Sequence, residues 1–300
     1  PTYLDLKSHG ETFTDIVNLK TDNSWYLDIF AKNLVGSYDT TQFGAIPMIS
    51  VGLFPLILAI LFFTIKSIKL SVKSAYAAFL FFLIASFYIE ALDLAWQGMH
   101  APNMFLHRYA WVFSTLIIYM AAETLVRIRE IKRIHLSITF LLLVTGFFLT
   151  FYFRDHYPYL EPIHFILTVE FLLAYGILLI GKIYKKIPFK IFSLLSLGFV
   201  LFEMGLHSHY QIEGLAAEWN FPSRSNYEDQ LTEIDNLVKG TNSKNSYFYR
   251  TEKLDIQTGN DSMKYNYYGI SQFSSVRNRS SSSTLDKLGF RSDGTNLNLR

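Results

Sequence analysis

Six long apolar runs, joined by short polar connections, dominate the middle of this chain. They lie at about 44–65, 74–92, 109–126, 134–153, 163–181 and 189–207. About 20 apolar residues in an α-helix cross the roughly 30 Å hydrocarbon core of a bilayer. The sequence therefore predicts a polytopic α-helical membrane protein with six transmembrane helices.

Composition agrees with this interpretation. Of the 300 residues, 50% are hydrophobic and 17% are charged, whereas soluble domains average roughly 25% charged residues. The apolar excess is confined to the middle of the chain, so three parts are predicted: an extracytoplasmic segment 1–43, a transmembrane region 44–207 and an extracytoplasmic domain 208–300. The chain begins at Pro1, without Met or a signal-like segment, and we interpret it as a piece of a longer protein with its last domain incomplete.

Basic residues alternate between the connections. Those at 66–73, 127–133 and 182–190 carry three or four Lys or Arg residues each, whereas 93–108 and 154–162 carry one each. Cytoplasmic loops of membrane proteins are enriched in Lys and Arg. The pattern predicts a multi-pass protein of the cell membrane with both ends extracytoplasmic.

Local signals give further elements. Gly44, Pro47, Gly52 and Pro55 predict a kink in the first helix. In the polar tail, a helix is predicted to begin at 225–226 and to stop at Gly240. Strands are predicted at 246–254 and 271–277, and a short helix at 284–288. Together they indicate a small mixed α/β extracytoplasmic domain.

Several classes of function are disfavoured. The net charge of +2 is too small to indicate a nucleic-acid partner. The chain has no cysteine, which excludes disulfides and thiolate metal sites. It also contains no Gly-rich phosphate loop, nucleophile elbow or H-E-x-x-H motif, which disfavours cytoplasmic nucleotide-driven chemistry. No cofactor is expected.

Polar residues gather at one predicted boundary, in the stretch 90–109. Glu90 and Asp93 are three residues apart and would share a helical face. Arg108 could grip a lipid phosphate through its planar fork, extend to headgroups, or pair with Asp93. A metal site from His100, His107 and Asp93 is conceivable, but nothing in the spacing enforces it, so no metal is predicted and dependence on a divalent cation stays open.

Two acids lie within predicted helices. Glu170 is about 10 Å below the outer end of its helix and is predicted to face the bundle interior. It would serve either a structural hydrogen bond or proton-coupled transport. Glu203 is predicted to join the same cavity.

A family resemblance rests on two groups of motifs. The stretch Trp96-x-Gly98-x-x-x-Pro102-x-x-Phe105-x-x-Arg108 leads into the helix at 109. The tail contains Phe248-Tyr249-Arg250, Asn260-Asp261, Tyr268-Gly269-Ile270-Ser271, Phe273-Ser274-Ser275 and Leu288-Gly289. These residues resemble the YfhO family of bacterial membrane proteins over roughly residues 25–300.

The resemblance implies a glycosyltransferase with a GT-C-type helix bundle, acting outside the membrane of Gram-positive bacteria. Such an enzyme would move a sugar from a polyprenyl-phosphate carrier onto lipoteichoic acid or a related envelope polymer. Arg108 and His107 would bind the lipid phosphate, and Asp93 or Glu90 would be the catalytic carboxylate, although the main catalytic acid of this fold class usually lies in an earlier loop. Trp96, Tyr268 and Asp261 would contact the acceptor.

Two other functions fit the sequence. A transporter or flippase of an envelope precursor would need ionisable residues through the depth of the bundle and usually an internal repeat. The acids here crowd towards the outer half instead. A non-catalytic membrane protein that binds wall polymer is the third hypothesis.

Overall fold

The structure is a computed structural model, and it describes ten stretches of the chain. These are residues 19–21, 23–99, 104–219, 223–228, 230–244, 247–254, 257–273, 283, 285–293 and 296–299. The chain divides into two units, residues 13–220 and residues 1–12 with 221–300. His100 and Pro102, which the sequence analysis singled out, lie outside the described residues.

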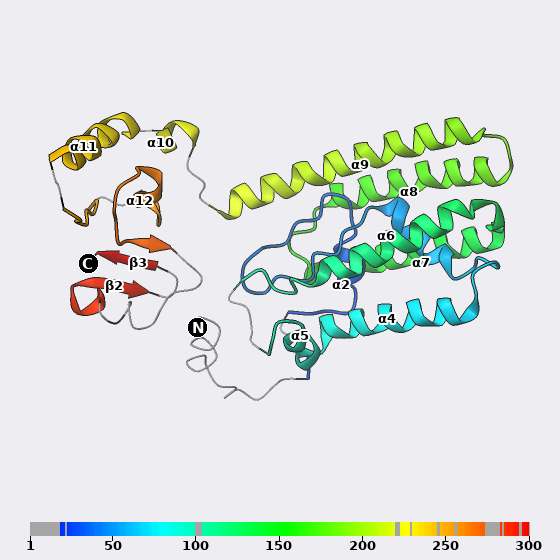
Figure 1. The fold of residues 1–300 in the computed structure, drawn as a ribbon. Coiled ribbons are helices and arrows are strands. Elements are labelled where there is room, and N and C mark those ends of the chain that lie inside the picture. The colour runs from blue at the N-terminus through cyan, green and yellow to red at the C-terminus, as the bar shows by residue number, and fades with distance from the viewer. Residues whose placement is uncertain are drawn as a thin grey trace. The chain divides into compact units, whose positions relative to one another are not determined.

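The unit 13–220 is helical (Figure 1). Its helices, in chain order, are α2 (Asp28–Ala31), α3 (Leu53–Phe62), α4 (Leu70–Tyr88), α5 (Glu90–Trp96), α6 (Ala110–Val126), α7 (Arg133–Tyr152), α8 (Pro162–Ile183) and α9 (Phe189–Glu218). Two short 3-10 turns, Ile128–Glu130 and Arg154–His156, lie at either end of α7.

Four of these helices, α4, α7, α8 and α9, are long and apolar enough to cross a membrane. The other two predicted spans are shorter: α6 rises about 25 Å and α3 only about 15 Å along its axis. Many large apolar side chains on the long helices are exposed, as expected where lipid replaces water. The fold is that of a polytopic membrane protein, but six full-length spans are not observed.

The prediction that residues 44–65 form one kinked helix is wrong. Its first part has no regular secondary structure, and α3 begins only at Leu53. Gly44 and Gly52 have φ of +88° and +81°, which a right-handed helix cannot contain. Pro55 falls in the first turn of α3, where its missing N–H costs no helical hydrogen bond.

The observed division of the chain also differs from the predicted boundaries. Residues 31–37, assigned from sequence to a separate segment 1–43, are all buried within the helical unit. At the other end, α9 continues past 207 to Glu218. The physical reason is that residues 28–52 pack between helices, so they belong to the bundle although they form little helix themselves.

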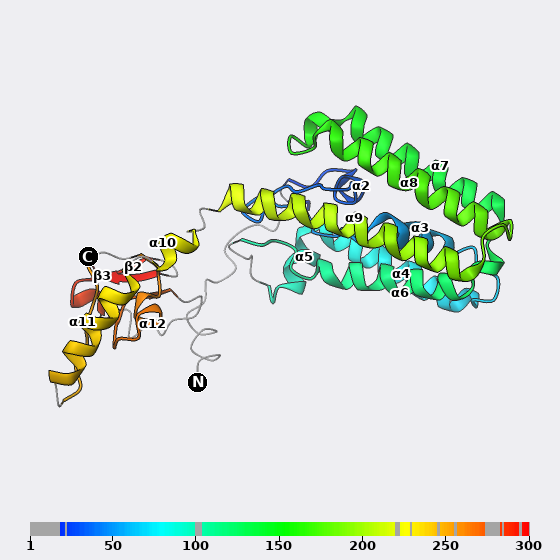
Figure 2. The same ribbon diagram turned by 90° about the horizontal axis from the view of Figure 1, so that it is seen from above.

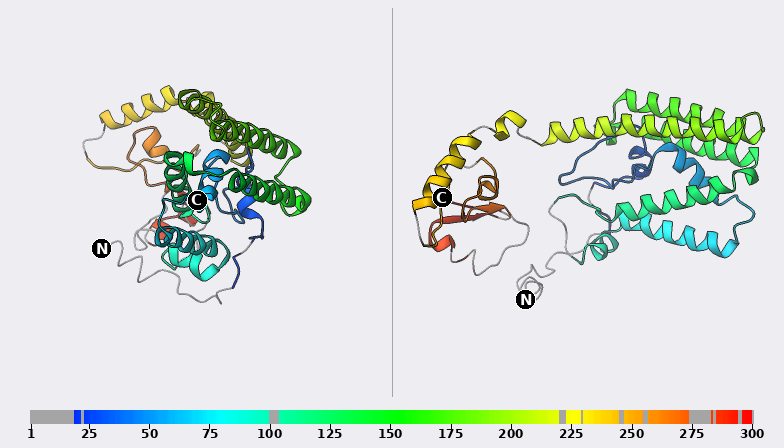
Figure 3. Two further views of the ribbon diagram at one scale, coloured as in Figure 1. Left: turned by 90° about the vertical axis from the view of Figure 1, so that its right-hand side faces the viewer. Right: turned by 45° about the horizontal axis from the view of Figure 1, so that its top comes forward.

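Helix α3 lies in the middle of the bundle, with its most extensive packing against α6 and further packing against α7 and α8 (Figures 2 and 3). Its side chains Leu53, Ile57 and Leu61 have no exposed surface. A short helix buried on all sides needs no amphipathic pattern, which explains why its sequence is apolar throughout.

The unit with residues 221–300 contains both helices and strands. These are α10 (Arg224–Glu228), α11 (Leu231–Lys244), α12 (Asp261–Lys264), β1 (Gln272–Phe273), β2 (Phe290–Asp293) and β3 (Asn296–Leu299). The strands form an antiparallel sheet in the order β1-β3-β2.

Details of this unit differ from prediction. Helix α11 continues through Gly240 to Lys244, and residues 247–254 contain no strand, so the predicted strand 246–254 is wrong over its described part. The turn at Gly289, with φ of +98°, follows helical residues 285–287 as predicted.

Candidate functional site

The irregular segment 32–52 runs through the bundle, and side chains from α8 and α9 satisfy its backbone. Thr168 Oγ accepts the N–H of Val35 at 2.9 Å, and His207 Nδ1 accepts the N–H of Gly36 at 3.1 Å. Non-helical backbone at membrane depth is tolerated only where protein or a water-filled cavity surrounds it. Here the polar residues of α8 and α9 make that arrangement possible.

A polar cavity of about 190 Å³ lies between this segment and α9. Its lining residues are Lys32, Ser37, Met48, Ser50, His207 and Gln211. Lys32 forms an ion pair with Asp39, and the two side chains are only 2% and 7% exposed. Asp39 also accepts the N–H of Ile46 at 2.9 Å. A buried ammonium that lines a cavity and has one carboxylate partner retains further N–H donors for a ligand.

The hydrogen bond from Gly36 determines which ring nitrogen of His207 carries the proton. Because Nδ1 accepts a backbone N–H, the proton of a neutral ring must sit on Nε2. Gln211 Nε2 donates to the carbonyl of Ser37 at 2.5 Å and lies 3.3 Å from His207 Nε2. With the Gln211 amide in this orientation, Gln211 Nε2 and His207 Nε2 are both N–H donors. Together with Lys32, the cavity offers several N–H groups, the arrangement that an anionic ligand requires.

Glu203 lies deeper in the bundle and does not line this cavity. Its carboxylate is 4% exposed and accepts hydrogen bonds from the N–H of Leu53 and the hydroxyl of Tyr175, both at 2.7 Å. It therefore holds the start of α3 in place.

Glu170 was predicted to face the interior, and this is wrong: its side chain is exposed on α8. Helical periodicity alone could not tell which face the neighbours leave uncovered.

Loop 104–109, segment 38–42 and the end of α9 meet at the rim of the same end of the bundle. The N–H of Phe105 donates to the carbonyl of Thr41 at 2.9 Å, and the ring of Phe105 stacks on Trp219 at 6.4 Å. Trp219 Nε1 donates to Thr41 Oγ at 2.8 Å. The sequence-predicted loop is thus attached directly to the segment that lines the cavity.

The structure brings Asp93 and His107 together, as part of a buried cluster. Asp93 Oδ1 lies 2.7 Å from His107 Nδ1 and accepts the Tyr109 hydroxyl at 2.9 Å, while Oδ2 accepts from Gln97 at 2.9 Å. The Tyr109 hydroxyl also lies 2.7 Å from the carbonyl oxygen of Ser86. Both carboxylate oxygens are engaged, which suits a residue that orients His107.

The other predicted residues of this loop lie apart from that cluster. Arg108 is exposed, and its guanidinium donates to the carbonyls of Phe105 and Met104 at 3.2 and 3.1 Å. Glu90 is half-buried at the start of α5. Trp96 stacks on Tyr109 with centroids 5.1 Å apart and leaves about a third of its surface exposed.

The predicted acceptor residues of the tail differ in accessibility. Tyr268 is 58% exposed and lies 6.0 Å from the exposed ring of Phe248. Asp261 is buried, and its carboxylate accepts the N–H groups of Gln257 and Thr258 at 2.8 and 2.7 Å. Asp261 therefore organises its own turn. Tyr268 and Phe248 are exposed, and the Arg250 guanidinium lies over the Phe248 ring at 5.1 Å from its centroid.

Within the described residues, no group of three or more His, Asp or Glu side chains is arranged to hold a metal ion. The conceivable set of His100, His107 and Asp93 falls partly outside those residues, because His100 is not described. The arrangement around Asp93 is a hydrogen-bonded cluster with Tyr109 and Gln97.

Sequence reasoning missed Lys32 and Asp39, because residues 1–43 read as ordinary polar protein. It also missed His207, the last residue of the predicted span 189–207. One signal was present: Lys32 stands, with Asn33, inside the mostly apolar stretch 29–35. A charge flanked by apolar residues is costly to bury unless it is paired and functional.

The long apolar helices, with an irregular segment and a polar cavity buried among them, are those of a polytopic membrane protein. The whole chain, residues 1–300, matches the family described as bacterial membrane protein YfhO, and the chain belongs to that family. No curated protein and no solved structure was found to match it.

Proposed function

We propose that this protein is an extracytoplasmic glycosyltransferase that takes a sugar from a polyprenyl-phosphate carrier and adds it to lipoteichoic acid or a related envelope polymer. The observation that carries the proposal is the cavity lined by Lys32 and His207. It presents N–H donors within the bundle, at the end away from the basic loops. A lipid-linked phosphate reaches a membrane protein from within the bilayer, so its site belongs at this depth.

In the proposed reaction, an acceptor hydroxyl attacks the sugar carbon and the bond to the carrier phosphate breaks. Lys32 and His207 stabilise the negative charge that grows on the leaving phosphate. Asp39, which is paired with Lys32, takes the proton of the acceptor hydroxyl. Arg108, exposed at the rim, is proposed to bind the phosphate as the carrier arrives.

The residues proposed from sequence take supporting roles in this scheme. Asp93 orients His107, which it contacts at 2.7 Å, and it is not among the residues that line the cavity of Lys32 and His207. Glu90 remains an alternative carboxylate. On the acceptor side, Tyr268 and Phe248 offer exposed aromatic faces, and such faces stack well on sugar rings. Trp96, with one face on Tyr109, offers its other face at the membrane boundary.

The test is sugar transfer by purified protein in proteoliposomes that contain a radiolabelled polyprenyl-phosphate hexose, with isolated envelope polymer as acceptor. We expect Asp39→Asn to slow transfer by about 10²- to 10⁴-fold, the usual contribution of a general base. Lys32→Met should slow it by about 10²- to 10³-fold. Exposed residues serve as matched controls, and neither Lys20→Met nor Asp155→Asn should change the rate.

Because Lys32 and Asp39 are buried, each variant is first checked for a monodisperse, cooperatively unfolding protein. A folded Lys32→Met protein with full transfer activity would remove the cavity from the mechanism. Movement of the labelled carrier across the liposome membrane without transfer would favour the transporter hypothesis. The outward orientation of Glu170 already weighs against a proton path along α8.

A further inference from the structure

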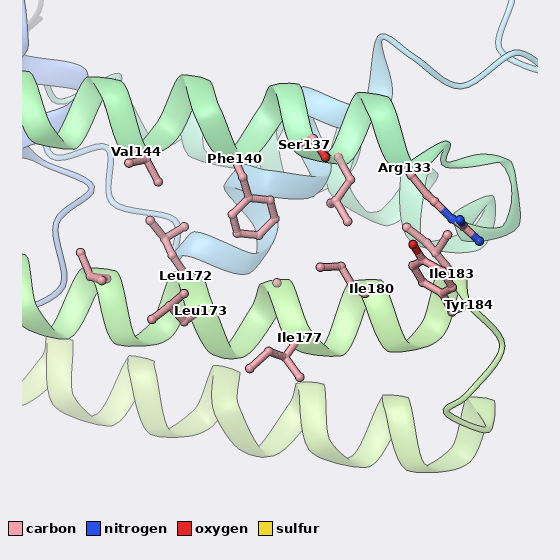
Figure 4. Close-up of a pocket in the computed structure, with 13 residues that line it drawn as sticks. Arg133, Ser137, Phe140, Val144, Leu172, Leu173, Ile177, Ile180, Ile183 and Tyr184 are labelled. Atoms are coloured by element: carbon pink, nitrogen blue, oxygen red, sulfur yellow. The ribbon is translucent and has the colours of Figure 1, made fainter.

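A second hollow lies between α7 and α8, near the end of the bundle where the basic loops gather (Figure 4). It measures about 390 Å³ and is apolar along most of its length. Phe140 and Val144 come from α7, and Leu173, Ile177 and Ile180 from α8. The last three are 49–68% exposed, so the groove opens towards the surroundings of the bundle.

The polar groups of this groove are confined to one end. Arg133, Ser137 and Tyr184 lie there, and the guanidinium of Arg133 stacks on the ring of Tyr184 at 3.6 Å from its centroid. Stacking fixes the plane of the guanidinium and leaves its N–H groups at the edge. In the described part of the chain, Arg133 has no carboxylate partner, so its positive charge is available to bind an anionic group.

The surroundings make this end strongly basic. The connections that flank α7 and α8 contain Arg129, Lys132 and Lys185, and the last turn of α8 contains Lys182. The two nearby acids in sequence are engaged elsewhere: Glu130 accepts from Ser67 at 2.6 Å, and Glu123 pairs with Arg127. The local field therefore favours a ligand that carries negative charge.

The length of the groove matches a lipid chain. From Arg133 to Val144 the axial rise is about 16 Å, close to the roughly 15 Å of one monolayer of a 30 Å hydrocarbon core. A molecule that combines an apolar chain of this length with a phosphate at one end is a membrane phospholipid.

We propose that the α7–α8 groove is a binding site for an anionic phospholipid, with one acyl chain along Phe140, Leu173 and Ile177 and the phosphate hydrogen-bonded to Arg133. The site is separate from the proposed transfer site, since its charged end lies among the basic loops. By the positive-inside rule, the lipid belongs to the cytoplasmic leaflet. It would fix α7 against α8 along a face that protein side chains leave open.

Native mass spectrometry of the detergent-solubilised protein, titrated with phosphatidylglycerol or phosphatidylcholine of identical chains, tests the site. The unsubstituted protein should bind phosphatidylglycerol at least about fivefold more tightly, the effect of one basic residue at an anionic surface. Arg133→Gln should abolish that preference. Lys132→Gln, which changes a neighbouring charge outside the groove, should keep it.

A second pair of variants tests the part of the groove that is proposed to bind the acyl chain of the lipid. Ile177→Trp should fill the groove and weaken both lipids, whereas Leu141→Trp, an exposed position of α7 outside the groove, should weaken neither. Inorganic phosphate should not compete, because it lacks the chain. Equal affinity for the two lipids, or an unchanged preference in a folded Arg133→Gln protein, would overturn the proposal. A dimer that Ile177→Trp converts to a monomer would do so too, by assigning the groove to a second copy.

Discussion

Glu203 accepts the backbone N–H of Leu53 at 2.7 Å, so a carboxylate of α9 caps a helix that begins inside the bundle 150 residues earlier in the chain. The same carboxylate accepts the Tyr175 hydroxyl from α8. Three helices are thereby joined at one buried group. Because α3 lies at the centre of the bundle, this junction positions the irregular segment that precedes α3 and lines the cavity.

We expect Glu203→Leu to destabilise the protein by about 2–4 kcal/mol. The change removes the cap of α3, worth about 0.5–2 kcal/mol, and leaves the buried Tyr175 hydroxyl without a partner, at about 1–3 kcal/mol. Glu203→Gln should cost less, since its amide oxygen can still accept from Leu53. Thermal unfolding in detergent measures both, and Glu213→Leu, exposed on the same helix, is the control. Equal stability of the Leu and Gln variants would contradict the capping role.

Two glycines of α9 provide a matched comparison. A Cβ at Gly214 would overlap the ring of Tyr38, whereas a Cβ at Gly205 would meet nothing within 4 Å. The Tyr38 hydroxyl donates a hydrogen bond to the Glu218 carboxylate. Gly214→Ala should therefore displace Tyr38 from Glu218 and cost about 1–3 kcal/mol. Gly205→Ala should be neutral or stabilising by up to about 1 kcal/mol, because Ala is the better helix former. A Gly214→Ala protein as stable as Gly205→Ala would show that segment 38–42 does not pack on α9 through Tyr38.

The Asp28 carboxyl should make stability depend on pH. Burial raises its pKa above the ordinary 3.8, and the hydrogen bonds from Trp25 and Tyr157 oppose burial only in part. The folded state then holds this proton more tightly than the unfolded state, so the stability from protonated Asp28 is present below pH 3.8 and is lost as pH rises through the folded pKa.

The measurement is the difference in Tm between the unsubstituted protein and Asp28→Asn across that pH range. As pH rises, we expect the Tm of Asp28→Asn to increase relative to the Tm of the unsubstituted protein. Above the raised pKa of Asp28 the difference should become constant. Asp155→Asn, at an exposed position, should show no such trend. A difference that moves the opposite way would mean that the hydrogen bonds outweigh burial at Asp28.

Asp93→Asn should reveal whether this carboxylate is chiefly structural. An amide presents only one acceptor oxygen to His107, Tyr109 and Gln97, so one or more of these donors loses its bond, and we expect about 1–3 kcal/mol of destabilisation. If the folded Asp93→Asn protein keeps transfer activity within about tenfold, Asp93 is a positioning residue. A loss of 10²-fold or more with unchanged stability would instead restore it as the general base.

How much was predictable is clearest from particular segments. The apolar runs at 74–92, 134–153, 163–181 and 189–207 were correctly predicted as helices, although α4 is shifted and α9 is longer. The cost of exposing backbone to lipid makes long apolar helices the only local solution. Asp93 and His107 were picked out by their position at a membrane boundary, and they do meet. The motifs at 96–108 and 248–289 resembled the YfhO family, and membership in that family is confirmed.

The remaining features depend on contacts between distant parts of the chain. Gly44 and Gly52, with their positive φ, decide that residues 44–52 are irregular backbone and not helix. Side chains of α8 and α9 supply acceptors for the N–H groups of Val35, Gly36 and Leu53 on either side of it. Lys32 could become a buried ion only because Asp39 and the cavity with His207 surround it. Local hydropathy thus determined that this is a membrane protein and where its long helices run. Only tertiary packing decided which polar groups are buried together, since burial of a charge is stable only when its partners are brought to it.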